Sequence, residues 1–312
     1  MLALFLHGNC RNLLLCHADA PRLAASRKFW ANGQLKTPLQ RVALILFEYF
    51  TTFAYMQSTD LPHILEYYEP ITLGEMSSIR LMNRIDIKFV TTMRRLQQLL
   101  EMAAAQYRVQ VANGTAMAQY YTRYFDTASH DMYFAHHNRR ANRQKLRIRS
   151  YLYSAQHFLE VKTKNNHGRT HKKRIALTRF DTDGTFDLCH EADAAFLAEH
   201  LRYAPSQMHE CIENRFKRIT LVNKMLTERL TIDTSLQFRN LGTDSRCDLN
   251  DLAIIELKRD GLTHSPILGM LNQLRIHPLG FSKYCMGTVL TDPGIKHNMF
   301  KPRLTALARI TR

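Results

Sequence analysis

Four cationic side chains alternate with uncharged ones along one short segment of the chain. In "NRQKLRIRSY", residues 142–151, they are Arg143, Lys145, Arg147 and Arg149. If this segment is a strand, residues two apart share one face at a spacing of about 7 Å. Four like charges then lie in a row, while Leu146 and Ile148 lie on the opposite face. Such a row is suited to binding a partner that carries several negative charges.

The same alternation recurs in four other segments, where isolated carboxylates join the cations. These are Arg84, Asp86 and Lys88 in "RIDIK", Glu160 and Lys162 in "FLEVKTK", Arg229 and Asp233 in "ERLTID", and Glu256 and Lys258 in "IIELKRD". Half-exposed antiparallel strands often have a solvated polar face of this kind. The alternative is a barrel whose charged face lines the lumen, with Arg and Lys binding phosphate oxygens and carboxylates holding a divalent cation. Repetition across five strands favours the second interpretation.

The overall composition favours a globular protein with an anionic partner. The chain has 312 residues, 45% of them hydrophobic, and a formal net charge of +16. This surplus fits nucleic acid, a membrane surface or a phosphate-rich small molecule. Nucleic acid is not expected, because the sequence has no recognition-helix pattern, zinc-finger spacing or aromatic stacking motif. Six cysteines without a CxxC pair indicate free thiols in a reducing, cytoplasmic compartment, and no apolar run is long enough for a membrane span.

Hydrophobic periodicity predicts many strands and few helices. Expected strands cover 82–92, 118–127, 132–137, 143–153, 157–164, 171–179, 215–222, 227–233 and 252–259, and expected helices cover 92–107, 191–202 and 266–275. This pattern predicts an α+β barrel or sandwich rich in antiparallel strands. Residues 1–55 are expected to be an N-terminal extension, either weakly ordered or upstream of the natural start, and residues 56–312 to form one domain.

Six segments in a fixed order make the chain resemble the VTC domain, the polyphosphate polymerase module of the CYTH-like, or triphosphate tunnel metalloenzyme, superfamily. They are "RIDIKFV", "YFDT…YFAHHNRRANRQKLRIRSY", "FLEVKTKNNHGRTHKKRI", "NRFKRITLVNKMLTERLTID", "IIELKRDG" and "GFSKYCMG". The resemblance implies an eight-stranded antiparallel β tunnel with helices packed outside. It implies that ATP passes its γ-phosphate to a growing inorganic polyphosphate chain in the lumen, with Mn²⁺ or Mg²⁺ as cofactor. Fungal relatives work beside a membrane channel, so a membrane protein partner is a further expectation.

The resemblance also assigns roles to single residues. Catalytic cations are expected at Lys88, Arg147, Arg149, Lys162, Arg229 and Lys283. Phosphate binding is expected at His136, Arg143, Lys145, Lys173, Arg218, Lys258 and Ser282. The metal is expected at Glu256, helped by Glu160.

Three departures from the family pattern bear on the activity. His136 stands where the fungal polymerase has an arginine, and Gly280 stands where it has a lysine. The first strand carries one carboxylate, Asp86, where the hydrolase branch has Glu-x-Glu-x-Lys, which favours phosphoryl transfer over two-metal hydrolysis. The alternatives are a triphosphate or polyphosphate hydrolase of the same fold and a module that binds polyphosphate without turning it over.

Overall fold

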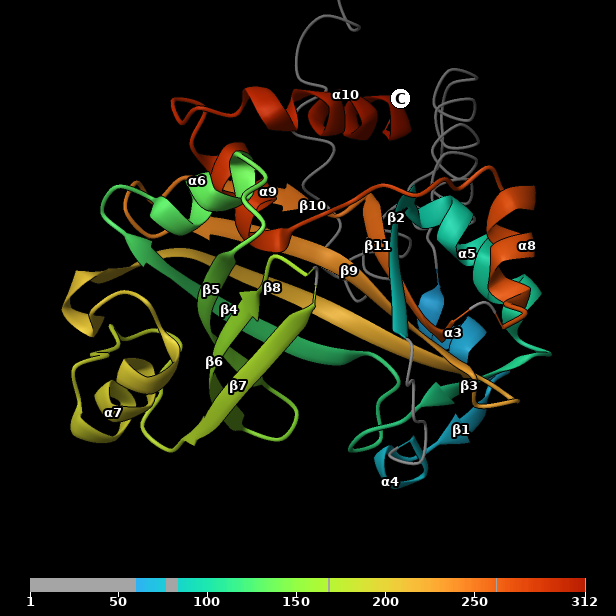
Figure 1. Cartoon of the computed structure of the whole chain (residues 1–312). Coiled ribbons are helices and arrows are strands. Elements are labelled where there is room, and N and C mark those ends of the chain that lie inside the picture. Colours follow the sequence, from blue (N-terminus) through green and yellow to red (C-terminus); the bar gives the residue numbers. More distant parts are fainter. Residues whose placement is uncertain (1–59, 77–83, 168, 262, 312) are drawn as a thin grey trace, which may run out of the picture. The chain divides into compact units, whose positions relative to one another are not determined.

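The computed structural model describes residues 60–76, 84–167, 169–261 and 263–311, and the expected extension over residues 1–55 lies outside them (Figure 1). The strands are β1 (Glu69–Ile71), β2 (Arg84–Thr92), β3 (Tyr107–Gln110), β4 (Ala118–Thr127), β5 (Arg143–Tyr151), β6 (Gln156–Lys164), β7 (Thr170–Leu177), β8 (Met208–Asn223), β9 (Glu228–Asn240), β10 (Arg246–Leu249) and β11 (Leu252–Asp260). The α-helices are α3 (Leu61–Leu65), α4 (Leu73–Met76), α5 (Met93–Ala103), α6 (Asp131–His137), α7 (Glu191–His200), α8 (Pro266–Gln273), α9 (Lys283–Thr291) and α10 (Lys301–Ile310). Two short 3₁₀ turns cover Pro205–Gln207 and Asn298–Phe300.

Eight strands follow one another in a continuous antiparallel sheet, as the sequence predicts. Their order is β2-β11-β9-β8-β4-β5-β6-β7, while β1, β3 and β10 add short pairings at the side. Within the described residues β2 and β7 do not pair with each other, so the sheet is not closed. The fold class is therefore an α+β antiparallel β tunnel with an opening between its first and last strands.

Strand β5 shows why one face of the sheet is charged. Its residues alternate between partly exposed cations and fully buried Gln144, Leu146, Ile148 and Ser150. Leu146 and Ile148 pack in one hydrophobic cluster with Leu197 of α7, so the apolar face is covered. We call the opposite face, which carries Arg147, the pocket face.

Helices α3, α5 and α8 cover the apolar face at the other end of the sheet (Figure 1). Helix α5 begins where the Thr92 side chain accepts a hydrogen bond from the Arg95 backbone N–H at 3.3 Å. Its stripe of Leu96, Leu99 and Leu100 packs against residues such as Ile255 of β11. Because Ile255 and Glu256 point to opposite faces of the strand, this packing directs Glu256 to the pocket face.

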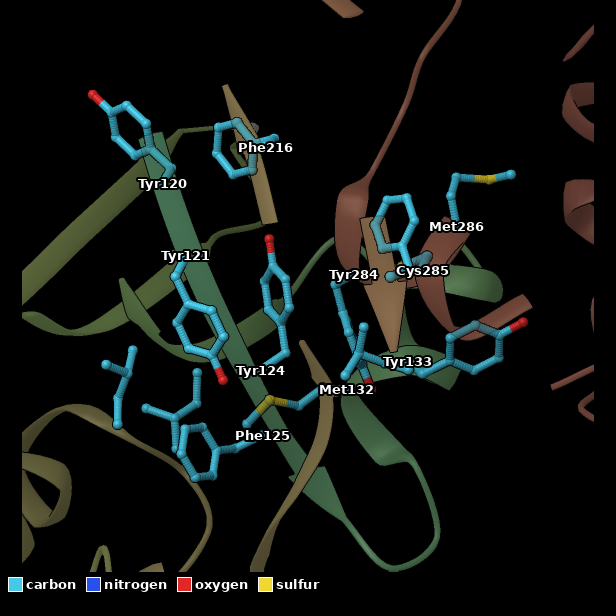
Figure 2. Packing of buried hydrophobic residues seen from close by; sticks show 14 of the residues in the cluster. Tyr120, Tyr121, Tyr124, Phe125, Met132, Tyr133, Phe216, Tyr284, Cys285 and Met286 are labelled. Carbon is cyan, nitrogen blue, oxygen red and sulfur yellow. The ribbon is translucent and has the colours of Figure 1, made fainter. Parts of the chain in front are cut away.

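Helix α9 lies on the pocket face, against β8 and β9. A Cβ atom at Gly287 would come within 2.6 Å of the Phe238 ring and 3.0 Å of Ile212, so only glycine permits this approach. Figure 2 shows the aromatic packing here, in which the rings of Tyr124 and Tyr284 stack with centroids 5.2 Å apart. This packing fixes the start of α9 beside the charged side chains of β5 and β9.

Residues 132–137, expected to be a strand, form helix α6 instead. The Asp126 carboxylate accepts hydrogen bonds from the backbone N–H groups of Met132 and Tyr133 at 2.9 and 2.8 Å, and it also accepts one from the Tyr284 hydroxyl. It satisfies the free N–H groups of the first helical turn from a residue outside that turn. The apolar and aromatic residues 132–137 favour a strand by themselves, but the hydrogen bonds from Asp126 stabilise a helix here.

Candidate functional site

A pocket of about 870 Å³ runs along the pocket face. All but two of the fifteen site residues expected from the sequence line it. The thirteen are Lys88, His136, Arg143, Lys145, Arg147, Arg149, Lys162, Arg218, Arg229, Glu256, Lys258, Ser282 and Lys283. Thirteen Lys and Arg residues in total, against Asp86, Asp233 and Glu256, make the lining strongly cationic.

Glu160, one of the two exceptions, lies beneath the pocket surface. Its side chain is fully buried, and its two oxygens accept hydrogen bonds from Arg147 Nε at 2.8 Å and Lys172 Nζ at 3.0 Å. Burial alone would raise the pKa of Glu160, but Arg147, Arg149 and Lys172 lower it to about 2. Because Glu160 is fully buried and does not line the pocket, a metal ion in the pocket would not reach it in this conformation, and its role as a metal ligand stays a prediction.

Lys173 is the second exception, and the hairpin register explains it. In the β6–β7 pairing, Lys162 lies opposite Lys172, and Val161 lies opposite Lys173. Cross-strand partners share a face, so Lys173 lies on the face of buried Val161. Lys172 occupies the pocket position that the sequence interpretation gave to Lys173.

Asp233 organises two of the expected cations, although its role was not anticipated. It accepts two hydrogen bonds from Arg218, from Nε at 2.6 Å and Nη2 at 2.9 Å, and it forms an ion pair with Lys283. Burial opposes its ionised form, but Arg218 and Lys283 hold the pKa of Asp233 well below its usual value. Its place on the same strand face as Arg229 was visible in the alternation of "ERLTID", whereas its two partners were not.

The beginning of α9 adds further positive charge to the pocket. Ser282 is the N-cap, and its hydroxyl accepts a hydrogen bond from the Cys285 backbone N–H at 3.3 Å. Lys145 Nζ donates to the same hydroxyl at 2.8 Å, and Lys88 Nζ donates to the Phe281 carbonyl at 3.3 Å. Because the N-terminus of a helix carries a partial positive charge, this end of the pocket favours an anion.

Several pocket groups are poised for a negative partner. The buried Arg149 Nε has no hydrogen-bond acceptor among the described residues. Burial, together with Arg147 and Arg218, lowers the pKa of Arg149.

Burial and the charge of Lys145 lower the pKa of His136 to about 2, so this imidazole is neutral at physiological pH. His136 therefore contributes polarity, and no charge, to the pocket.

Tripolyphosphate binding is expected to take up protons and to weaken as the pH rises from about 7 to 9. Burial lowers the pKa of Lys145, Lys162 and Lys283 to about 8 each, so the free protein loses these protons within this interval. A bound polyanion favours the ammonium forms and draws the protons back. Calorimetry at pH 8.5 in two buffers of different ionisation enthalpy measures the uptake, and Lys145→Met is expected to reduce it. Equal affinity at pH 7 and pH 9 would contradict this expectation.

Of the two residues expected to hold a divalent cation, Glu256 lines the pocket, whereas Glu160 does not. Glu256 is partly exposed to the pocket and is 3.6 Å from Lys88 Nζ and 3.0 Å from Lys258 Nζ. Asp86 pairs with Lys258 in register and lines the same pocket. Carboxylate oxygens suit Mg²⁺ and Mn²⁺, which are commonly held by one or two carboxylates together with substrate phosphates. Among the described residues no group of three or more His, Cys, Asp and Glu side chains could enclose a metal without such phosphates.

The pocket also contains residues that sequence reasoning did not select. They include Tyr124, Lys164, Thr170, Lys172, Phe281, Met286, Phe300 and Arg303. Lys164 and Lys172 continue the alternation of β6 and β7, which is a signal the sequence contains. Arg303 lies on α10 after the last matched segment, where no strand periodicity could identify it.

Two further features of the described part of the chain bear on expectations from the sequence. No helix there has the length and apolar character needed to cross a membrane. The cysteines in this part, Cys189, Cys211, Cys247 and Cys285, are free thiols.

One family model and several solved structures match the chain. A family model described as the VTC domain matches residues 83–291. Among solved structures, a proposed adenylate cyclase from Bacillus halodurans is 15% identical with a TM-score of 0.40, covering 64% of this chain and 96% of that one. A protein from Hippeastrum with a dominant triphosphatase activity is 16% identical with a TM-score of 0.38, covering 68% and 97%. No curated protein matches the sequence.

Proposed function

This chain belongs to the VTC domain family, and we propose that it is a polyphosphate polymerase that transfers the γ-phosphoryl group of ATP to the end of an inorganic polyphosphate chain. The observation that carries the proposal is the pocket face, on which thirteen Lys and Arg residues are balanced by only three carboxylates. Cations that line one pocket in such a number repel one another, and a bound polyanion would compensate their charge.

The proposed reaction needs little covalent help from the protein. A terminal oxygen of the acceptor chain attacks the γ-phosphorus, and the bond from that phosphorus to the β,γ-bridging oxygen breaks. The bridging oxygen keeps the electron pair and leaves as part of ADP, and the chain gains one phosphate unit. Because the attacking oxygen is already ionised, positioning and charge neutralisation account for most of the catalysis.

The pocket residues supply that positioning from several elements. Arg147 and Arg149 on β5, together with Lys162 on β6, face one side of the pocket. Their proposed role is to neutralise non-bridging phosphate oxygens. Lys283 lies at the start of α9, where Asp233 holds its ammonium group. Lys283 and the N-terminus of this helix are proposed to stabilise the charge that develops on the transferred phosphoryl group.

Glu256 is proposed to hold the metal ion, with Asp86 beside it and phosphate oxygens completing the coordination. When bound, Mn²⁺ or Mg²⁺ supplies charge neutralisation for the triphosphate. Lys88 and Lys258 keep the Glu256 carboxylate ionised, because their charges hold its pKa well below the usual value although burial opposes this. The carboxylate is therefore ready to bind a cation at neutral pH.

Incubation with ATP and Mn²⁺ followed by gel electrophoresis tests the proposed activity. A ladder of polyphosphate is expected from the parent protein and from Lys173→Ala, which changes a cation outside the pocket. Free phosphate without polymer would instead identify a hydrolase. Binding of polyphosphate without turnover of ATP would identify a non-catalytic binding module, and either result would reject the polymerase proposal.

A further inference from the structure

A second cavity of about 170 Å³ lies beside the large pocket. Its lining comes from α6, from the start of β5 and from the segment between α7 and β8, and includes Arg140, Arg143, Arg202 and Tyr203. Arg143 also lines the large pocket, so the two spaces meet at this side chain. The volume is below the ~300 Å³ at which pockets for drug-sized ligands begin, and therefore suits a small group.

The cavity has an excess of positive charge. Arg140, Arg143 and Arg202 line it, and none of them forms an ion pair with a carboxylate among the described residues. Asp131 is the acidic lining residue, and its Oδ2 already accepts hydrogen bonds from the hydroxyls of Thr127 at 2.8 Å and Ser129 at 3.2 Å. Three arginines that line one small space are suited to a phosphate group.

Hydrogen bonds fix the backbone that carries these arginines. The buried Gln144 side chain accepts from the Arg202 backbone N–H at 2.9 Å and donates to the His200 carbonyl at 2.8 Å. Arg143 Nη1 donates to the Arg140 carbonyl at 2.7 Å, which ties β5 to the preceding turn. In that turn Arg139 has a φ of 57°, a conformation that is costly for a residue other than glycine. The backbone at Arg140 and Arg202 and the side chain of Arg143 are therefore held in place before any ligand arrives.

We propose that this cavity is a phosphate-group subsite, separate from the large pocket of the proposed phosphoryl transfer (the transfer pocket) and joined to it through Arg143. Two sources could supply the group. One is the end of a polyphosphate chain that extends beyond the transfer pocket. This version of the proposal rests on the proposed function. The other is free inorganic phosphate. Arg143 would then contact both this phosphate and the chain in the transfer pocket, so the phosphate concentration would affect binding of the chain.

The test uses the full chain and the double variant Arg140→Ala/Arg202→Ala. Arg94→Ala/Arg95→Ala is the matched control, since it removes two exposed arginines from α5, and neither residue lines a cavity described above. Calorimetry measures the binding of tripolyphosphate, of long-chain polyphosphate, and of inorganic phosphate to protein saturated with tripolyphosphate. Inorganic phosphate is also titrated without tripolyphosphate, so the subsite is tested even if the transfer pocket binds none.

Each result has a distinct meaning. If the subsite holds a chain end, the double variant binds long chains at least ten-fold more weakly than the control but binds tripolyphosphate equally well. If it holds free phosphate, the double variant loses at least ten-fold in affinity for inorganic phosphate. Equal binding of all ligands by the double variant and the control would overturn the proposal. A parent protein that binds no tripolyphosphate would reject the proposed function instead.

Discussion

Replacing Arg149 by Ala is expected to lower kcat/KM for ATP by about 30- to 900-fold, which corresponds to ~2–4 kcal/mol of lost transition-state stabilisation. Arg149 lies between other cations of the pocket face, and its buried Nε has no acceptor among the described residues. Its hydrogen-bonding capacity is therefore available for a phosphate oxygen. Steady-state kinetics of ADP release, with polyphosphate present as acceptor, measure the change.

The control for this variant is Arg94→Ala, which removes an exposed arginine of α5. It is expected to keep the parent kcat/KM within two-fold or so, since a surface charge far from the substrate is screened by salt. Circular dichroism and the urea midpoint show whether Arg149→Ala remains folded. A folded Arg149→Ala protein with full activity would mean that the pocket face is not where the phosphates bind.

Replacing Glu160 by Gln is expected to lower the free energy of unfolding by about 3 kcal/mol at pH 7, because it leaves Arg147 and its neighbour Lys172 without the buried carboxylate that they share. The folded-state pKa of Glu160, about 2, lies below its value of 4.5 in an unfolded chain. The stabilisation is thus complete above about pH 4.5 and is lost as the pH falls toward 2. Urea unfolding of the parent and the variant measures the difference.

Tripolyphosphate distinguishes a structural Glu160 from a metal-binding one. In metal-free buffer, Glu160→Gln is expected to bind tripolyphosphate more tightly than the parent, because the ligand supplies the missing negative charge. Glu101→Gln, which changes an exposed carboxylate of α5, is the control and is expected to alter neither stability nor affinity. Unchanged stability of Glu160→Gln, combined with weaker Mn²⁺ binding, would instead support the expected role as a metal ligand.

The sequence predicts the charged face well because side chains in a strand repeat with a period of two. Once 143–151 is assigned as a strand, Arg147 and Arg149 must share a face opposite Leu146 and Ile148, and the structure has this arrangement. The same reasoning fails across a turn. Lys172 and Lys173 are adjacent, and only the pairing register of β6 with β7 decides which of them reaches the pocket.

Contacts between distant segments explain the remaining differences. Asp126 caps α6 and bonds Tyr284 of α9, so the helix at 131–137 depends on residues that local periodicity does not include. Glu160 looks like a metal ligand in "EVKTK", but its actual partners come from β5 and β7. In both cases the residue types are visible in the sequence, whereas their partners are set by tertiary packing.

The position of a bound phosphate chain tests the central claim most directly. A crystal structure of the protein with tripolyphosphate and Mn²⁺ is expected to show the three phosphorus atoms on the pocket face. Arg149 and Lys162 should lie within hydrogen-bond distance of non-bridging oxygens, and the metal should lie beside Glu256. Tripolyphosphate bound elsewhere, such as along the outer face of β7 at Lys173, would contradict the account.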